Sequence, residues 1–273
     1  MDLIIQDISL AFTTLEYPVT IIFVSIFLFL FGAVLASFTG LVVHRLGHLE
    51  EGDSVLYAIS VPPSHCESCG KRLGFLELVP VLGWVISKGK CSDCGYSVPI
   101  KYPFIEALLG ISFAAIPFIV GDFDWWVLSF GLVLAIGFMI VWIDLEHHII
   151  PEEATWLLLF SGLLISPASY DIFDKVVGAA VCTAAMWLSL TIVGMLKGED
   201  THAGGDVAMA AAAGAWVGIG MTPVFLFATS LVYTCHAGLE RYHGRKWTPM
   251  GPALAVSLLI SLIFSFANFG RLL

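Results

Sequence analysis

The amino-acid sequence predicts an all-α polytopic membrane protein with about eight transmembrane helices and a small zinc-ribbon-like cytoplasmic domain. Of the 273 residues, 58% are hydrophobic and only 12% are charged, and the mean hydropathy is +0.92. So few charges cannot cover the surface of a soluble protein of this size. The apolar residues gather in runs long enough to cross a bilayer. In addition, four of the six cysteines form two C-x-x-C pairs in the single long polar segment.

The apolar runs define the expected membrane spans. A transmembrane helix needs about 20 apolar residues. The run at 207–238 would measure about 50 Å as one helix, well beyond the hydrocarbon thickness of about 30 Å. We therefore expect it to break at the turn-like sequence at 220–223, which gives eight spans. The sixth is rich enough in Ala and Gly to pack closely against its neighbours. The runs are 19–43, 102–120, 125–143, 154–165, 176–196, 207–238 and 252–269.

The positions of the basic residues support eight spans and orient them. Lys and Arg gather on the cytoplasmic side of a membrane protein. With the N-terminus outside, eight spans leave only Lys175 and Arg271 on the outer side, whereas seven spans would add three more. Asp144 and Asp206 then lie at the same, cytoplasmic face. The ten residues on that side are Arg45, Lys71, Arg72, Lys88, Lys90, Lys101, Lys197, Arg241, Arg245 and Lys246.

Three domains follow from this topology. Residues 1–43 hold an N-terminal segment and the first span, residues 44–101 form the cytoplasmic four-cysteine domain, and residues 102–273 form a seven-helix membrane domain. The partners of such a chain include membrane lipid. The net charge of −10 and the scattered basic residues exclude nucleic acid, because binding a polyanion requires a basic surface.

The four cysteines of the polar segment have the spacing of a structural zinc site. Cys66 and Cys69 form one C-x-x-C pair and Cys91 and Cys94 the other, and each pair is followed by a glycine. Two such knuckles supply the four thiolates of a tetrahedral Zn²⁺ site. Redox cysteines and disulfides are alternatives, but the cytoplasm disfavours disulfides. Four protein ligands leave no open position on the metal, so its role would be to fold the domain.

Asp144 and Asp206 are the candidate catalytic residues. Asp144 ends one apolar run, and Asp206 opens another after Gly204 and Gly205. A carboxylate at the edge of a membrane span is costly and by default marks a functional site. Taken singly, Asp144 could be a solvated helix end and Asp206 a helix N-cap. Their common face and the paired glycines, which permit close backbone approach, favour a pair.

Two carboxyls that share a site have a definite chemistry. Both cannot ionise cheaply, so one keeps a proton near neutral pH. The charged carboxylate can deprotonate a water while the neutral one donates a hydrogen bond to a scissile carbonyl. This is amide hydrolysis without a covalent intermediate. The pair titrates as a unit, so the sequence does not say which aspartate holds the proton.

Motifs along most of the chain resemble the type IV prepilin peptidase family. The two C-x-x-C pairs, P-V-L-G-W at 80–84, K-G-K-C-S-D-C at 88–94 and Y-P-F-I-E at 102–106 are similar to the family's cytoplasmic domain and second span. D-L-E-H at 144–147 with I-P at 150–151 resembles its first aspartate motif. G-D-V at 205–207 with G-A-W at 214–216 resembles the second. Positions that differ from the family pattern are Gly40, Gly47, Glu152, Ala203 and Ala208.

The resemblance implies an integral aspartic endopeptidase of the bacterial cytoplasmic membrane, with its active site facing the cytoplasm. Members remove the short basic leader from prepilins and type II secretion pseudopilins. Many also methylate the new N-terminus, which adds S-adenosylmethionine as a candidate cofactor beside structural zinc. Carried over by motif, the catalytic residues are Asp144 and Asp206, and residues 102–273 are the peptidase domain.

Two other functions are compatible with single features. A transporter could use Asp144 and Asp206 as proton or cation sites; it should show an internal repeat, and the sequence has none visible. A membrane scaffold could use the zinc module to dock a cytoplasmic partner. Cysteine substitutions would then abolish binding while the aspartates could be changed freely. A presenilin-like peptidase would not explain the four cysteines.

Overall fold

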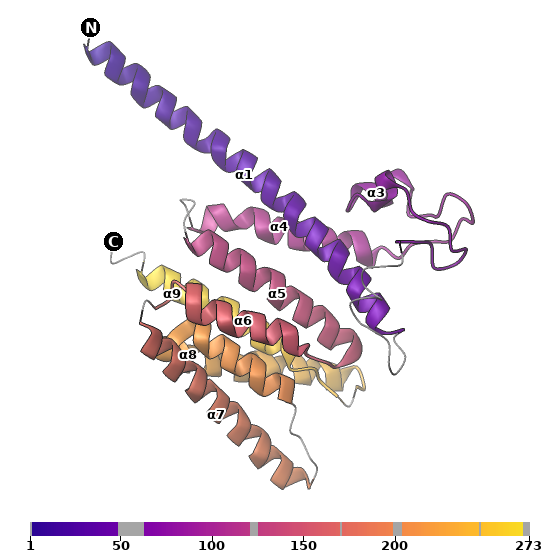
Figure 1. The fold of residues 1–273 in the computed structure, drawn as a ribbon, viewed down its shortest axis with the longest axis vertical. Coiled ribbons are helices and arrows are strands. Elements are labelled where there is room, and N and C mark those ends of the chain that lie inside the picture. Colours follow the sequence, from indigo (N-terminus) through magenta and orange to yellow (C-terminus); the bar gives the residue numbers. More distant parts are fainter. Residues whose placement is uncertain are drawn as a thin grey trace. The chain divides into compact units, whose positions relative to one another are not determined.

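The computed structural model describes residues 2–48, 63–120, 125–169, 171–198, 204–245 and 247–269, with only the backbone for 2–18, 125 and 269. The chain forms two compact units, Met1–Phe123 and Asp124–Leu273. Figure 1 traces the helices of each unit. The described residues contain no β-strand beyond two isolated bridges, which confirms the predicted all-α class.

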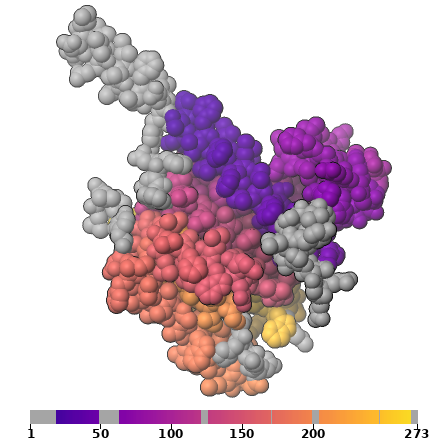
Figure 2. Space-filling view, in the orientation of Figure 1, coloured from indigo at the N-terminus to yellow at the C-terminus, as the bar shows by residue number. Residues whose placement is uncertain are grey.

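The first unit pairs two long helices and carries the four-cysteine segment between them. Glycines permit the close packing of the long helices, because a Cβ on Gly32 would lie 2.9 Å from the Leu109 carbonyl oxygen, and one on Gly110 would lie 2.9 Å from Phe29. The four-cysteine segment forms a compact lobe, purple in Figure 2. The elements are α1 (Asp2–Leu46), the 3₁₀ helix η1 (Phe75–Leu78), α3 (Leu82–Ile86) and α4 (Lys101–Val120).

The second unit is a bundle in which α8 contacts α6, α7 and α9. The Ala- and Gly-rich start of α8 packs closely, as predicted. A Cβ on Gly178 of α7 would lie 2.6 Å from the Gly214 carbonyl oxygen, and Trp216 donates its indole N–H to the Leu158 carbonyl at 2.8 Å. The elements are α5 (Trp125–His147), α6 (Glu152–Ile165), α7 (Ile172–Lys197), α8 (Gly204–Tyr242) and α9 (Gly251–Phe269).

Helix α8 breaks at Gly218, where φ is 68° and ψ is 174°. The predicted break at 220–223 therefore begins two residues after the actual one. Only glycine adopts this backbone conformation easily, whereas Pro223 lies five residues beyond the break, inside the second arm of the helix. Tyr233 and Asp206 are 27 residues apart, about 40 Å along a straight helix. The two side chains nevertheless lie close enough for the Asp206 carboxyl to act electrostatically on Tyr233, so the two arms of α8 fold back on each other at this break.

The eight predicted spans are accounted for by these helices. Within the described residues, six helices are long and apolar enough to cross a membrane: α1, α4, α5, α7, α8 and α9. The two arms of α8 count as two spans, and the 14-residue α6 is the short run that the sequence predicted at 154–165. The chain is a multi-pass membrane protein. The domain boundaries at residues 43/44 and 101/102 stay a prediction.

Candidate active site and metal centre

Asp144 lies in the last turn of α5, because that helix continues past the predicted end at 143 to His147. Its side chain is only 4% exposed. The carboxylate Oδ2 accepts a hydrogen bond of 2.7 Å from the backbone N–H of Gly251. Gly251 begins α9, and the first N–H groups of a helix have no partner within the helix. The start of α9 therefore binds the Asp144 carboxylate and satisfies one of its own N–H groups.

Asp206 lies in the first turn of α8 and is partly exposed. The preceding Gly205 lies against Ile150, since a Cβ on Gly205 would lie 2.9 Å from the Ile150 Cβ and 3.3 Å from its carbonyl oxygen. Ile150 follows Asp144 by six residues, so the two aspartate motifs are in direct contact. The Asp144 and Asp206 carboxyls are also close enough for their charges to interact. The fold thus brings the two predicted site residues together.

The second arm of α8 adds polar side chains that the sequence analysis did not identify. His236 acts electrostatically on Asp144, as does the exposed His148. The His236 Nε2 lies 3.8 Å from Glu240 Oε1, and Arg245 donates to both Glu240 oxygens at 3.2 and 3.1 Å. Among the described residues, the buried His236 Nδ1 has no hydrogen-bond partner.

The sequence contains a pattern that could have predicted these polar residues of the second arm of α8. Tyr233, His236 and Glu240 follow one another at intervals of three and four residues, so they share one face of a helix that is otherwise largely apolar. The signal could not be connected with Asp206 without knowing that α8 folds back at Gly218. Glu106, the other carboxylate within a predicted span, makes its described contacts in the first unit, where it accepts hydrogen bonds from the Val81 N–H and from Ser37.

The four cysteines of the first unit can hold a metal ion. Their sulfur atoms all lie within 4.8 Å of one another. Cys66 and Cys94 are separated by 3.8 Å between sulfurs, and Cys69 and Cys91 by 3.9 Å. A tetrahedral zinc site with bonds of about 2.3 Å requires sulfur separations of about 3.8 Å. The arrangement therefore fits four-thiolate zinc ligation. His65 does not belong to the cluster and contacts the Pro63 carbonyl instead.

The two C-x-x-C pairs have the same backbone structure. In the first, the Cys66 N–H donates to the Lys71 carbonyl at 2.8 Å and the Gly70 N–H to the Cys66 carbonyl at 2.9 Å. Cys91 repeats both bonds with residues 96 and 95 at 2.9 and 3.0 Å. The glycine after each pair has φ of about 71° (Gly70) and 72° (Gly95), a conformation that favours glycine. The sequence prediction of two equivalent knuckles agrees with this geometry.

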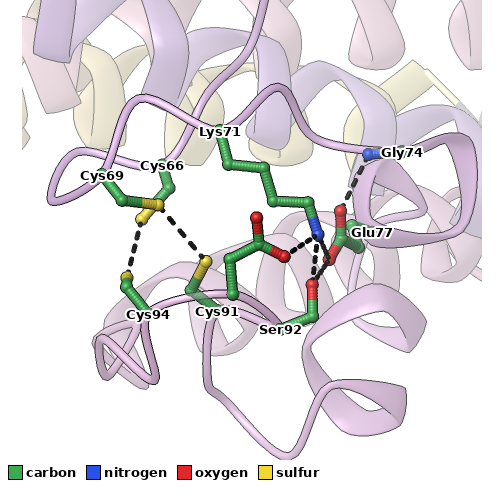
Figure 3. Close-up of polar contacts among 9 residues, drawn as sticks. Cys66, Cys69, Lys71, Gly74, Glu77, Cys91, Ser92 and Cys94 are labelled. Carbon is green, nitrogen blue, oxygen red and sulfur yellow. Dashed lines mark hydrogen bonds and ion pairs between the residues drawn. The ribbon is translucent and has the colours of Figure 1, made fainter.

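Electrostatic contacts join the two knuckles, as Figure 3 shows. Lys71 of the first knuckle lies 2.5 Å from the Ser92 hydroxyl and 3.1 Å from the Asp93 carboxylate of the second. The backbone N–H groups of Cys94 and Asp93 lower the pKa of Cys91 to about 7. Since zinc binds thiolates, a thiol that ionises near neutral pH is an easy first ligand.

The chain is similar to one family over both units. The model of the bacterial peptidase A24 N-terminal domain matches residues 30–120, and the model of the type IV leader peptidase family matches residues 130–238. No solved structure matches.

Several similar proteins carry the name prepilin leader peptidase/N-methyltransferase. The protein from Dichelobacter nodosus is 28% identical over 94% of this chain and 96% of its own length. That from Aeromonas hydrophila is 29% identical over 86% of this chain and 89% of its own length. The Neisseria gonorrhoeae protein is 29% identical over 77% of this chain and 73% of its own length.

Proposed function

Because the chain belongs to the type IV leader peptidase family, we propose that it cleaves the leader from type IV prepilins or type II secretion pseudopilins with Asp144 and Asp206 as its catalytic pair. The observation that carries the proposal is the meeting of the two aspartate motifs. The Gly205–Ile150 contact and the electrostatic interaction of the two carboxyls join residues that lie 62 positions apart.

The proposed reaction uses the two carboxyls in complementary states. The ionised carboxylate takes a proton from a water, whose oxygen attacks the scissile carbonyl carbon. The protonated carboxyl donates a hydrogen bond to the carbonyl oxygen and stabilises the tetrahedral intermediate. When the C–N bond breaks, the leaving amine takes up a proton from the pair. No covalent enzyme intermediate forms, and the pair returns to its starting protonation state.

The site suits a substrate that lies partly in the membrane. Asp144 ends a membrane helix and Asp206 begins another, and both lie at the face that the positive-inside rule assigns to the cytoplasm. The apolar helix of a prepilin would lie in the bilayer while its basic leader meets this acidic protein. We place the protein in the bacterial cytoplasmic membrane with its active site facing the cytoplasm.

Two cofactors belong to the proposal. Zinc would be held by the four cysteines and would fold their module without taking part in hydrolysis. S-adenosylmethionine is proposed because the relatives named above are also called N-methyltransferases. Mass spectrometry of a candidate prepilin co-expressed with the protein tests both activities. It should show loss of the leader and, if methylation occurs, the added mass of one methyl group.

Substituting Gly251 by alanine is expected to lower the cleavage rate about 10- to 100-fold. The added Cβ would lie 2.7 Å from Asp144 Oδ2 and 3.1 Å from Asp144 Cβ, so the carboxylate must move. A hydrogen bond to a charged group contributes about 1.5–3 kcal/mol, which sets this range. Single-turnover cleavage of a purified prepilin measures it. Gly238→Ala is the control, since no atom lies near its added Cβ. Equal rates for both variants would contradict the role of Gly251.

Two substitutions of His236 are expected to show which of its two ring nitrogens supports cleavage. Asparagine can place a nitrogen near the Nδ1 position and glutamine near the Nε2 position. If the unpartnered Nδ1 serves the site, His236→Gln should slow cleavage by about tenfold, the worth of one hydrogen bond, and His236→Asn should retain more of the rate. His243→Gln is the control, because His243 is exposed and contacts the Leu239 carbonyl. A faster Gln variant than Asn variant would show that the contact with Glu240 matters instead.

A further inference from the structure

The segment between the two cysteine knuckles exposes large apolar side chains. In α3, Leu82, Val85 and Ile86 are 55%, 57% and 64% exposed. They are spaced at i, i+3 and i+4, so they share one face of the helix. The 3₁₀ helix η1 adds Phe75 and Leu76, which are 83% and 64% exposed. In water, this exposed apolar surface would be unfavourable, and such patches mark interaction sites.

Inward contacts hold this apolar face in place. Gly83 is buried against the backbone of Glu77, and the Trp84 indole N–H donates to the Val98 carbonyl at 3.0 Å. Glu77 accepts hydrogen bonds from the Gly74 N–H at 2.8 Å and from Ser92 at 2.9 Å. The residues between the exposed apolar positions therefore pack against the rest of the four-cysteine segment. The apolar side chains are on the outer side of a segment whose inner side is already packed.

A hydrogen bond fixes the position of the start of α3 along helix α4. The Val81 N–H donates to Glu106 Oε2 at 2.7 Å, and Ser37 of α1 also hydrogen bonds to Glu106. Glu106 is five residues into α4, which is about 7.5 Å from the start of that helix. The interfacial layer on each side of a bilayer is about 5–8 Å thick. The start of α3 therefore lies beside the first two turns of α4, within about one interfacial thickness of the beginning of this helix.

The residue that connects α3 to α4 by a hydrogen bond, Val81, has a strained backbone conformation. Val81 has φ of 62° and ψ of −54°, a costly conformation for a β-branched residue, and the Leu82 N–H closes a γ-turn to the Pro80 carbonyl at 2.6 Å. Such a conformation persists only where its surroundings hold it. The Glu106 carboxylate does so by binding the Val81 N–H, and it thereby fixes the apolar face of α3 relative to α4.

We propose that η1 and α3 form an interfacial membrane anchor, with the apolar face made by Phe75, Leu76, Leu82, Val85 and Ile86 inserted into the lipid layer at the cytoplasmic end of α4. Amphipathic segments of this kind bury their apolar face about 5–10 Å into the boundary between headgroups and acyl chains. Phe104, two residues before Glu106 in α4, is also a large exposed apolar side chain, as expected of a helix surface that faces lipid.

The basic residues around this face suit the same partner. Lys88, Lys90 and Lys101 are exposed and follow α3 or begin α4. Lysines at this level can extend to the headgroups and attract anionic lipid. A lipid layer explains the apolar face, its level beside α4 and the basic residues together. It does not depend on the identity of the catalytic residues.

Photo-crosslinking of the full-length protein in lipid nanodiscs tests the anchor. p-Benzoylphenylalanine is placed at position 75, 82 or 86, and the nanodiscs contain phosphatidylethanolamine and phosphatidylglycerol. After irradiation, mass spectrometry of the digested protein identifies what each position has bound. We expect lipid adducts at all three positions. Position 104 in α4 is the positive control, and position 96, an exposed tyrosine in the second knuckle, is the matched aromatic negative control.

The outcomes separate the partners that an apolar face could have. Adducts to lipid at 75, 82 and 86 but not at 96 support the anchor. Adducts to another part of the same chain, to a second copy or to an added prepilin, without lipid, would overturn it. The absence of lipid adducts at 75, 82 and 86 where position 104 gives them would overturn it as well. Each labelled protein is used only if its thermal melting midpoint matches that of the unlabelled protein.

Discussion

Replacing Asp144 or Asp206 by asparagine is expected to abolish leader cleavage while the protein still folds in the membrane. Asparagine has nearly the shape of aspartate but can neither take a proton from water nor return one to the leaving amine. General acid–base groups contribute about 10²–10⁴-fold to a rate, and each substitution disables the pair as a unit. We therefore expect a loss of about 10³-fold or more. Single-turnover cleavage of a purified prepilin in detergent or nanodiscs measures it.

A matched carboxyl-to-amide change controls for general effects of lost charge. Glu153 lies exposed in the first turn of α6, close in sequence to the first aspartate motif. Glu153→Gln should cleave at nearly the normal rate. Normal cleavage by either aspartate variant would contradict the proposal that Asp144 and Asp206 are the catalytic pair. Such a result would leave peptidase activity to other residues. Failure of the unchanged protein to cleave a prepilin would instead favour a transporter or a scaffold.

Removing one zinc ligand is expected to unfold the four-cysteine module and leave the membrane helices in place. Binding of structural zinc releases about 10–16 kcal/mol in small zinc peptides, and for a small module this is folding free energy. Within residues 63–100, the described elements are only a four-residue 3₁₀ helix and a five-residue α-helix, which cannot supply a core of comparable strength. Cys66→Ser should therefore lose the metal and make the module sensitive to protease.

Zinc content and limited proteolysis measure this effect together. The unchanged protein should contain one zinc ion per chain by elemental analysis, and a strong chelator should reproduce the protease sensitivity of the variant. Cys235→Ser is the control, because Cys235 is a free, exposed cysteine outside the cluster. A metal-free protein that still protects residues 63–100 from protease would contradict the structural role. Loss of cleavage in Cys66→Ser would show that the module also supports the peptidase.

Much of the fold was predictable because membrane spans are local features. About 20 apolar residues suffice to predict each long helix, and the predicted runs fall within α1, α4, α5, α7, α8 and α9. The break in α8 was predictable from its length but not from its exact position. Gly218 is one of several glycines in α8, and its conformation depends on close packing against Asp174 and Gly178. Those contacts come from another helix.

The cysteine site was predictable from spacing, because each C-x-x-C knuckle is a short local structure. The apolar face of η1 and α3 was not. A run of apolar residues in the sequence does not say which side chains turn inward. The contacts of Gly83 and Trp84, together with the hydrogen bond from Val81 to Glu106, decide which positions are exposed and at what level along α4.

The sequence by itself determined the membrane class, the family, the four-cysteine site and the two carboxylates, because each depends on composition, spacing or motif. Only the tertiary structure decided what surrounds those carboxylates. Gly251 binds Asp144 from another helix, and His236 approaches it because α8 folds back on itself at Gly218. These are contacts between residues far apart in the chain. Their physical basis is close helix packing and the capture of an unpaired helix N–H by a buried carboxylate.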